Sequence, residues 1–220
     1  MNTFFLDRLN SEPHALAFAG QSTPWPVALA DQSANPTLDE ALHTHAAAAQ
    51  ALLYPVSAEL LATTGRPVDL FGFEPNPARL GAAAASSASV PGIALTQLGA
   101  LIDAASLGYN PAKAKPIAVL GHSQGVLAVH MVQAIREAGS IEAASASIDE
   151  ILAIATLIGV AGTRQARQLG LAARHGDATP MLSVKDITRA QVDALIERVD
   201  GARGPIAVAV TNSATHYVLS

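Results

Sequence analysis

Two patterns of apolar and polar residues occur along the chain, and each predicts a different kind of secondary structure element. Short apolar runs that end in glycine occur at 15–20 (ALAFAG) and at 116–121 (PIAVLG), and they predict buried strands. Longer segments repeat an apolar residue every three or four positions, which is typical of amphipathic helices. The segments of this second kind are 37–62, 91–108, 126–135 and 147–170. Because strands and helices alternate with short links, the pattern predicts a mainly parallel sheet with helices on both faces.

Three predicted helices begin with a threonine or serine that is followed three residues later by glutamate or glutamine. The pairs are Thr37 with Glu40, Ser147 with Glu150, and Thr188 with Gln191. In such a capping box the two side chains satisfy backbone N–H groups at the helix start. We therefore expect helices to begin at these three positions. A further helix is expected to begin at Pro91 and to end at Gly108.

The pattern changes near Gly176. After it, the sequence predicts a strand (TPMLSV), a helix over 188–199, a strand (PIAVAVTN) and a last strand (HYVLS). This order is that of the first three quarters of a ferredoxin-like unit. We therefore predict two domains, an α/β core at 1–176 and an incomplete ferredoxin-like subdomain at 177–220, whose completion needs a further helix and strand after Ser220.

Composition and charge exclude several classes of protein. The 220 residues are 50% hydrophobic and carry 13 Lys and Arg against 18 Asp and Glu, a net charge of -5. Because no basic stripe is present, nucleic acid is excluded as a partner. The chain has no cysteine, which excludes thiol catalysis and disulfides and fits a reducing compartment. Since the first residues lack the pattern of a signal peptide, we expect a cytoplasmic protein.

Membrane and metal sites are not expected either. The uncharged stretches 81–102 and 116–135 have about the length of a membrane helix, but both are diluted by polar residues and glycine, so they predict buried core. His43 and His45, two apart on a predicted helix, point in different directions and predict no metal site.

Ser123 lies in the sequence PIAVLGHSQGVLAV, between a predicted strand and a predicted helix. A serine at such a junction sits in a strained turn, and Gly121 and Gly125 remove side chains that would collide where strand and helix cross. Its hydroxyl group stands at a helix N-terminus, where the amide of Gln124 and the helix dipole stabilise an oxyanion. The pattern predicts a nucleophile, with an ordinary strand-to-helix turn as the alternative.

GHSQG, together with AFAGQS near the N-terminus, resembles the acyl-CoA:acyl-carrier-protein transferases, the malonyl and acetyl transferase family. The match is strongest to the N-terminal acetyltransferase domain of microbial type I fatty acid synthases, on the segments GHSQGVLAV, SVPGIALTQLGAL, LIGVAGT and PMLSV. The resemblance implies an α/β-hydrolase-like acyltransferase core. It implies that Ser123 takes an acyl group from coenzyme A and yields it to the phosphopantetheine thiol of an acyl carrier protein. The implied partners are acyl-CoA, a carrier protein domain and the other synthase domains, with no bound cofactor.

The same resemblance assigns roles around Ser123. Gln21 lies at the family's oxyanion glutamine, the backbone amide of Gln124 is the second donor, and His122 lines the substrate pocket. Ser22 departs from the family, which has glycine there, and this puts the pose of the first loop in doubt.

The expected substrate follows from a second departure. Malonyl-specific members carry an arginine on the long helix after the nucleophile, where it pairs with the substrate carboxylate. Ile158 stands at that position here, or Ala161 if the alignment shifts by three residues, and neither binds a carboxylate. Arg164 and Arg167 lie further along the helix and are expected to face another side. An acetyl group is therefore the expected substrate, with malonyl or palmitoyl transfer as the alternative within the family.

The resemblance also implies a catalytic histidine in a Phe-His-Ser/Thr segment after the ferredoxin-like unit, and the sequence contains no such segment. His216, the last of the seven histidines, aligns with an earlier strand and is not expected to be the base. We therefore expect the isolated chain to lack its general base and to be inactive or nearly so.

Two other functions remain open. A serine hydrolase of the α/β type, such as a thioesterase, would need an Asp and then a His after Ser123, and Asp186 or Asp200 with His216 is the loose candidate set. The early AGQS loop, in place of a His-Gly-Gly loop, disfavours it. The other alternative is a non-catalytic remnant in which GHSQG is only a fold element.

Overall fold

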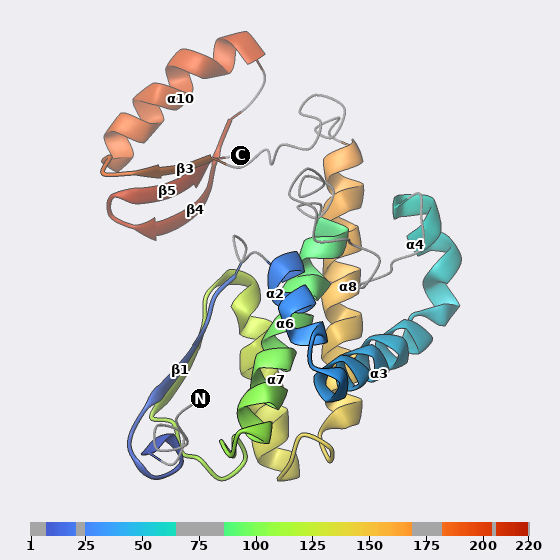
Figure 1. Cartoon of the computed structure of the whole chain (residues 1–220). Coiled ribbons are helices and arrows are strands. Elements are labelled where there is room, and N and C mark those ends of the chain that lie inside the picture. The colour runs from blue at the N-terminus through green and yellow to red at the C-terminus, as the bar shows by residue number, and fades with distance from the viewer. Residues whose placement is uncertain (1–7, 21–24, 65–85, 169–181, 204–205, 220) are drawn as a thin grey trace. The chain divides into compact units, whose positions relative to one another are not determined.

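The structure of the chain is a computed structural model, and it is mixed α/β and mostly helical (Figure 1). It describes residues 8–20, 25–64, 86–168, 182–203 and 206–219. The chain forms two compact units, Met1–Gly170 and Leu171–Ser220.

The first unit contains a small parallel sheet. Strand β1 (Ala15–Phe18) pairs with β2 (Ala118–Gly121), and Phe18 lies opposite Gly121 at the carboxyl ends of the two strands. Both strands lie where the sequence predicts them. The predicted burial is wrong for both strands, because no residue of either strand is buried and Leu120 is 59% exposed. Among the described strands, β1 and β2 pair only with each other. The larger parallel sheet of a hydrolase-like core stays a prediction.

Six helices of the first unit surround a common apolar core. They are α2 (Trp25–Ser33), α3 (Pro36–Leu52), α4 (Ser57–Thr64), α6 (Ser86–Ser106), α7 (Val126–Ala138) and α8 (Ser145–Gln168). Helices α6 and α8 lie side by side, and α3, α4 and α7 also contact α8 (Figure 1). The two uncharged stretches of the sequence supply much of the core, as predicted. Their fully buried side chains include Ile93, Leu95, Leu98, Met131 and Ile135.

Helix α8 is a core helix, with Ile148, Leu152 and Ala155 fully buried. Among the described helices, its stretch Ser145–Gln165 is long and apolar enough to cross a membrane, by length and composition alone. A buried core helix passes the same test. The contacts of α8 with four neighbouring helices account for its buried apolar residues, whereas Ile154, Leu157 and Ile158 are exposed.

Helix α3 begins before the predicted capping box. The side chain of Asn35 accepts a hydrogen bond from the backbone N–H of Thr37 at 3.2 Å, so Asn35 is the N-cap and Pro36 follows it. Asparagine is a strong N-cap, and proline suits the first helical position because its missing N–H would be unpaired there. The predicted cap of Thr37 with Glu40 is therefore wrong.

The single helix predicted over 37–62 is also wrong. A 3-10 turn, η1 (Tyr54–Val56), separates α3 from α4. Pro55 in this turn has no N–H to continue the helical hydrogen bonds, and its ring clashes with the preceding turn of an α-helix.

Helix α6 begins before Pro91, which lies inside it. The backbone N–H of Ser87 donates to Oγ1 of Thr163 on α8 at 3.0 Å, which satisfies one of the donors that a helix start leaves unpaired. The predicted start at Pro91 is therefore wrong, because a contact from a distant helix supports an earlier turn. Gly108 follows the helix with a φ of +105°, as predicted for its terminating residue.

Helix α8 begins at Ser145, so Ser147 lies inside its first turn and the predicted start at Ser147 is wrong. The preceding turn is held by Ser140, whose hydroxyl oxygen accepts a hydrogen bond from the backbone N–H of Ala143 at 3.0 Å. This turn lets the helix begin earlier than the Ser147–Glu150 pattern indicates.

The second unit has the predicted order of strand, helix, strand and strand. Its elements are β3 (Leu182–Lys185), α10 (Arg189–Arg203), β4 (Val208–Ser213) and β5 (His216–Leu219). The antiparallel sheet has the order β3-β5-β4 (Figure 1). Val192 of α10 is fully buried in a cluster with Tyr217 and Leu219. The predicted capping box is confirmed, since Oε1 of Gln191 accepts from the backbone N–H of Thr188 at 2.9 Å and Oγ1 of Thr188 accepts from that of Gln191 at 3.4 Å.

Candidate active site

The turn around Ser123 joins the carboxyl end of β2 to helix α7. Residues Ser123–Gly125 form a 3-10 turn, η3, and α7 begins at Val126. The backbone N–H of His122 donates to the carbonyl of Phe18 at 3.0 Å, and that of Gly125 donates to the carbonyl of His122 at 2.9 Å. The first bond extends the β1–β2 pairing into the turn, so β1 holds the turn from one side.

Ser123 has a strained backbone and an exposed side chain. Its φ is +54°, in the left-handed region that residues with a Cβ avoid at a cost of roughly 1–2 kcal/mol. Among the described non-glycine residues only Asp186 shares such a φ. An exposed serine in a strained turn between a strand and a helix is the geometry of a nucleophile elbow.

Three glycines allow the elbow to pack closely. A Cβ on Gly121 would come within 2.6 Å of the carbonyl carbon of Gly125, and a Cβ on Gly125 would collide with the carbonyl group of Phe18. A Cβ on Gly20 would come within 2.6 Å of the carbonyl oxygen of His122 and within 2.7 Å of the Cβ of Ser123. The sequence predicts this need for Gly121 and Gly125, and the structure adds Gly20.

Of the two oxyanion donors that the sequence predicts, Gln124 is described by the structure and Gln21 is not. The backbone of Gln124 lies at the start of the helical turn, where N–H groups have no partner within the helix and favour negative charge. Within the described part of the chain, Oε1 of its side chain is buried without a hydrogen-bond partner. Gln21, the other predicted oxyanion donor, lies outside the described residues. His122 is exposed and extended, with a φ of -96° and a ψ of 126°.

Gln97 of α6 is a further polar residue beside this turn. Its Nε2 donates to the carbonyl of Ala19 at 2.5 Å, and α6 contacts η3. In the sequence, Gln97 is recognisable as an amide within an otherwise apolar stretch of predicted helix. The sequence alone does not predict which backbone group this amide binds.

Ile158, the predicted wall of the acyl pocket, lies on α8 and is 51% exposed. Its neighbour Leu157 is 42% exposed. Arg164 faces α4, where its guanidinium pairs with Glu59 at 2.9 Å, so it is engaged elsewhere as the sequence suggests. The side chain of Arg167 lies outside the described residues. The proximity of Ile158 to Ser123 stays a prediction.

At least four of the described histidines are engaged by other groups. His14 contacts Glu12 and Tyr109, His43 contacts Asp39, His45 contacts Asp149, and His216 contacts Ser183. His175 lies outside the described residues.

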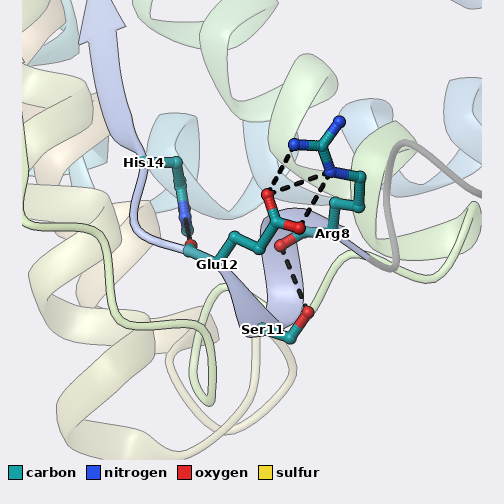
Figure 2. Close-up of polar contacts among 4 residues, drawn as sticks. All are labelled: Arg8, Ser11, Glu12 and His14. Atoms are coloured by element: carbon teal, nitrogen blue, oxygen red, sulfur yellow. Dashed lines mark hydrogen bonds and ion pairs between the residues drawn. The ribbon is translucent and has the colours of Figure 1, made fainter.

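The segment before β1 shows how His14 is held (Figure 2). Nδ1 of His14 lies 3.0 Å from the carbonyl oxygen of Glu12, and Nε2 lies 3.1 Å from the Tyr109 hydroxyl. Burial raises the pKa of Tyr109, which keeps this hydroxyl protonated. The guanidinium of Arg8 binds the Glu12 carboxylate and lowers its pKa. Because both ring nitrogens have partners, this histidine has a structural role.

A cavity of about 630 Å³ lies between β2 and α7, but away from the elbow. Its walls are residues at the start of β2, such as Ile117 and Val119, and side chains of α7, such as Val132 and Arg136. Ser123 and its neighbours follow the opposite end of β2, so this cavity does not serve them.

A family model matches most of the chain. The family model described as "Starter unit:ACP transacylase in aflatoxin biosynthesis" matches residues 74–218, which include Ser123, Gln124 and Ile158. The search of curated proteins found no match.

Proposed function

This chain belongs to the starter unit:ACP transacylase family, and from that premise we propose that it transfers an acyl group from coenzyme A to an acyl carrier protein through an ester of Ser123. The family is one of acyltransferases that act with a carrier protein. The observation that supports Ser123 as the nucleophile is its exposed, left-handed position at the start of a helix.

The proposed reaction has two balanced halves. Oγ of Ser123 attacks the thioester carbonyl carbon, its proton passes to a general base, and the tetrahedral intermediate expels the thiolate of coenzyme A, which takes up a proton. The phosphopantetheine thiol then attacks the Ser123 ester, and the serine hydroxyl leaves with the proton that the thiol gave up. The backbone N–H of Gln124 and the proposed donor Gln21 stabilise the oxyanion in both halves.

We do not assign the general base to His14, His43, His45 or His216. His45 is held by Asp149 at 2.6 Å and is buried, and both ring nitrogens of His14 have partners. Proton transfer needs a ring nitrogen that can approach the serine hydroxyl.

The proposed acyl group is acetyl, and the proposed context is fatty acid synthesis in a multidomain synthase. Ile158 supplies no charge for a substrate carboxylate, which favours an uncharged acyl group over malonyl. The elbow is proposed to belong to a hydrolase-like acyltransferase core, in which His122 lines the acyl pocket.

The test follows the fate of a single acyl group. The full chain is incubated with radioactive acetyl-CoA, separated from it, and then mixed with pantetheine or with buffer alone. Because none of these histidines is assigned as the general base, we expect slow labelling over a long incubation. The acetyl groups that do form should pass to the pantetheine thiol with little release of acetate, and the Ser123→Ala variant should not be labelled. Equal release of acetate in buffer alone would identify a hydrolase, and an unlabelled chain would contradict the proposal.

A further inference from the structure

Gln97 connects helix α6 to the segment that follows β1. The side chain is only 8% exposed, and its Nε2 donates to the carbonyl of Ala19 at 2.5 Å. A buried amide that binds a backbone carbonyl outside regular structure fixes the orientation of that peptide group. The peptide that follows this carbonyl leads directly into Gly20.

Gly20 in turn lies against the elbow. A Cβ built on it would meet the carbonyl oxygen of His122, the Cβ of Ser123, and the backbone nitrogen of Gln124 at 3.2 Å. The segment that Gln97 holds is therefore packed on the nucleophile and on the proposed oxyanion donor. A shift of this segment would move the groups that surround the reacting carbonyl.

The oxygen atom of the Gln97 amide destabilises the fold. This atom, Oε1, is buried and has no hydrogen-bond partner among the described residues. A buried polar atom without a partner costs on the order of 1–3 kcal/mol, so stability alone does not explain an amide at this position.

We propose that Gln97 is a positioning residue for acyl transfer: it fixes the Ala19–Gly20 backbone against the elbow and so sets the geometry of Ser123 and the Gln124 amide. This inference rests on the proposed function, because it requires Ser123 to be the nucleophile.

Gln32 offers a matched control. Its Nε2 donates to the backbone carbonyl of Thr96 at 2.9 Å, and its Oε1 is also buried with no partner on any residue that the structure describes. It thus has the same chemistry as Gln97, but it binds α2 to α6 and not the segment beside Ser123. Methionine at either position keeps the approximate volume and removes the hydrogen-bond donor.

The experiment measures how fast a fluorophosphonate probe modifies Ser123 in the full chain, at a temperature where every variant is folded by circular dichroism. We expect Gln97→Met to lower the second-order rate constant by roughly 10- to 100-fold, because small misplacements in an active site have effects of this size. Gln32→Met should lose similar thermal stability and leave the rate constant within about twofold of the unmodified chain, because Gln32 binds the α6 backbone at Thr96 and leaves the bond from Gln97 to Ala19 in place.

A pH profile separates positioning from general stability. In the Gln97→Glu variant the protonated carboxyl group can donate to the Ala19 carbonyl, and the ionised group cannot. The ratio of its rate constant to that of the unmodified chain should therefore rise as the pH falls.

The outcomes are distinguishable. If the probe does not modify Ser123 in the unmodified chain, the proposed function fails, and the inference fails with it. Three results would refute the positioning role and leave Ser123 as the nucleophile, provided that the unmodified chain reacts. Gln97→Met could react as fast as the unmodified chain, or both methionine variants could be slowed equally. The third such result is a Gln97→Glu rate ratio that does not change with pH.

Discussion

Gly125 lies directly against Phe18: a Cβ on Gly125 would come within 2.8 Å of the carbonyl carbon of Phe18. These residues are far apart in the sequence, one after the nucleophile and the other at the end of β1. The carbonyl of Phe18 also accepts the backbone N–H of His122. The first strand therefore determines the position of Ser123 as directly as the strand that precedes it.

Gly125→Ala tests this packing. We expect the added methyl group to force the turn away from β1, to cost about 1–3 kcal/mol in the free energy of unfolding, and to slow fluorophosphonate labelling of Ser123. Gly139→Ala is the control, because Gly139 has a φ of +91° and open space around it, so alanine there costs about 1–2 kcal/mol through backbone strain alone. Equal labelling rates in the two variants would contradict the account.

Ser123→Gly tests the strain at the elbow. Glycine adopts a φ of +54° without the penalty of a Cβ, so this variant should be more stable than Ser123→Ala by about 1 kcal/mol in urea unfolding. Both variants should fail to react with the probe. If the two are equally stable, the turn stores no strain.

Ile158→Arg tests the acyl preference. The side chain is 51% exposed, so the helix can accept arginine with little loss of stability, and its planar guanidinium can pair with a substrate carboxylate. We expect acyl-enzyme formation to shift from acetyl-CoA towards malonyl-CoA by roughly tenfold, about 1.4 kcal/mol. Leu157→Arg adds the same charge at the next position, which faces another direction. The assignment is wrong if the two variants give the same ratio.

The His45–Asp149 pair should stabilise the first unit. It joins α3 to α8 with 2.6 Å between Nδ1 and Oδ1, and both side chains are largely buried. Asp149→Ala should cost about 1.5–3 kcal/mol in unfolding, whereas Glu59→Ala, which breaks the exposed pair with Arg164, should cost less than about 1 kcal/mol. Neither should change the labelling of Ser123. A larger loss from Glu59→Ala would reverse this interpretation.

The sequence predicts those features of the site that depend only on residues close together in the chain. The glycines at 121 and 125 and the apolar run before them are enough to predict a strand, a tight turn and a helix around Ser123, because spacing alone carries these constraints. The box of Thr188 and Gln191 is local in the same way. At Asn35 the prediction chose the wrong residue, since the pattern considered threonine and overlooked a stronger cap just before a proline.

The remaining features depend on contacts between distant segments. Two hydrogen bonds join residues that no local pattern connects. One runs from Gln97 to Ala19, and the other runs from Ser87, at the start of α6, to Thr163 on α8. The exposure of Leu120 likewise depends on which strands pair with β2 and not on the apolar run itself. Tertiary packing decides these points, so hydrophobic periodicity cannot predict them.

The central claim is that Ser123 accepts the acyl group. Incubation of the full chain with radioactive acetyl-CoA, followed by proteolysis and mass spectrometry, locates the acetyl group directly. The account predicts slow acetylation, to at most one acetyl group per chain, on the peptide that contains Ser123, and none in the Ser123→Ala variant. An acetyl group on another residue, kept in Ser123→Ala, or no acetyl group on the unmodified chain, would contradict it.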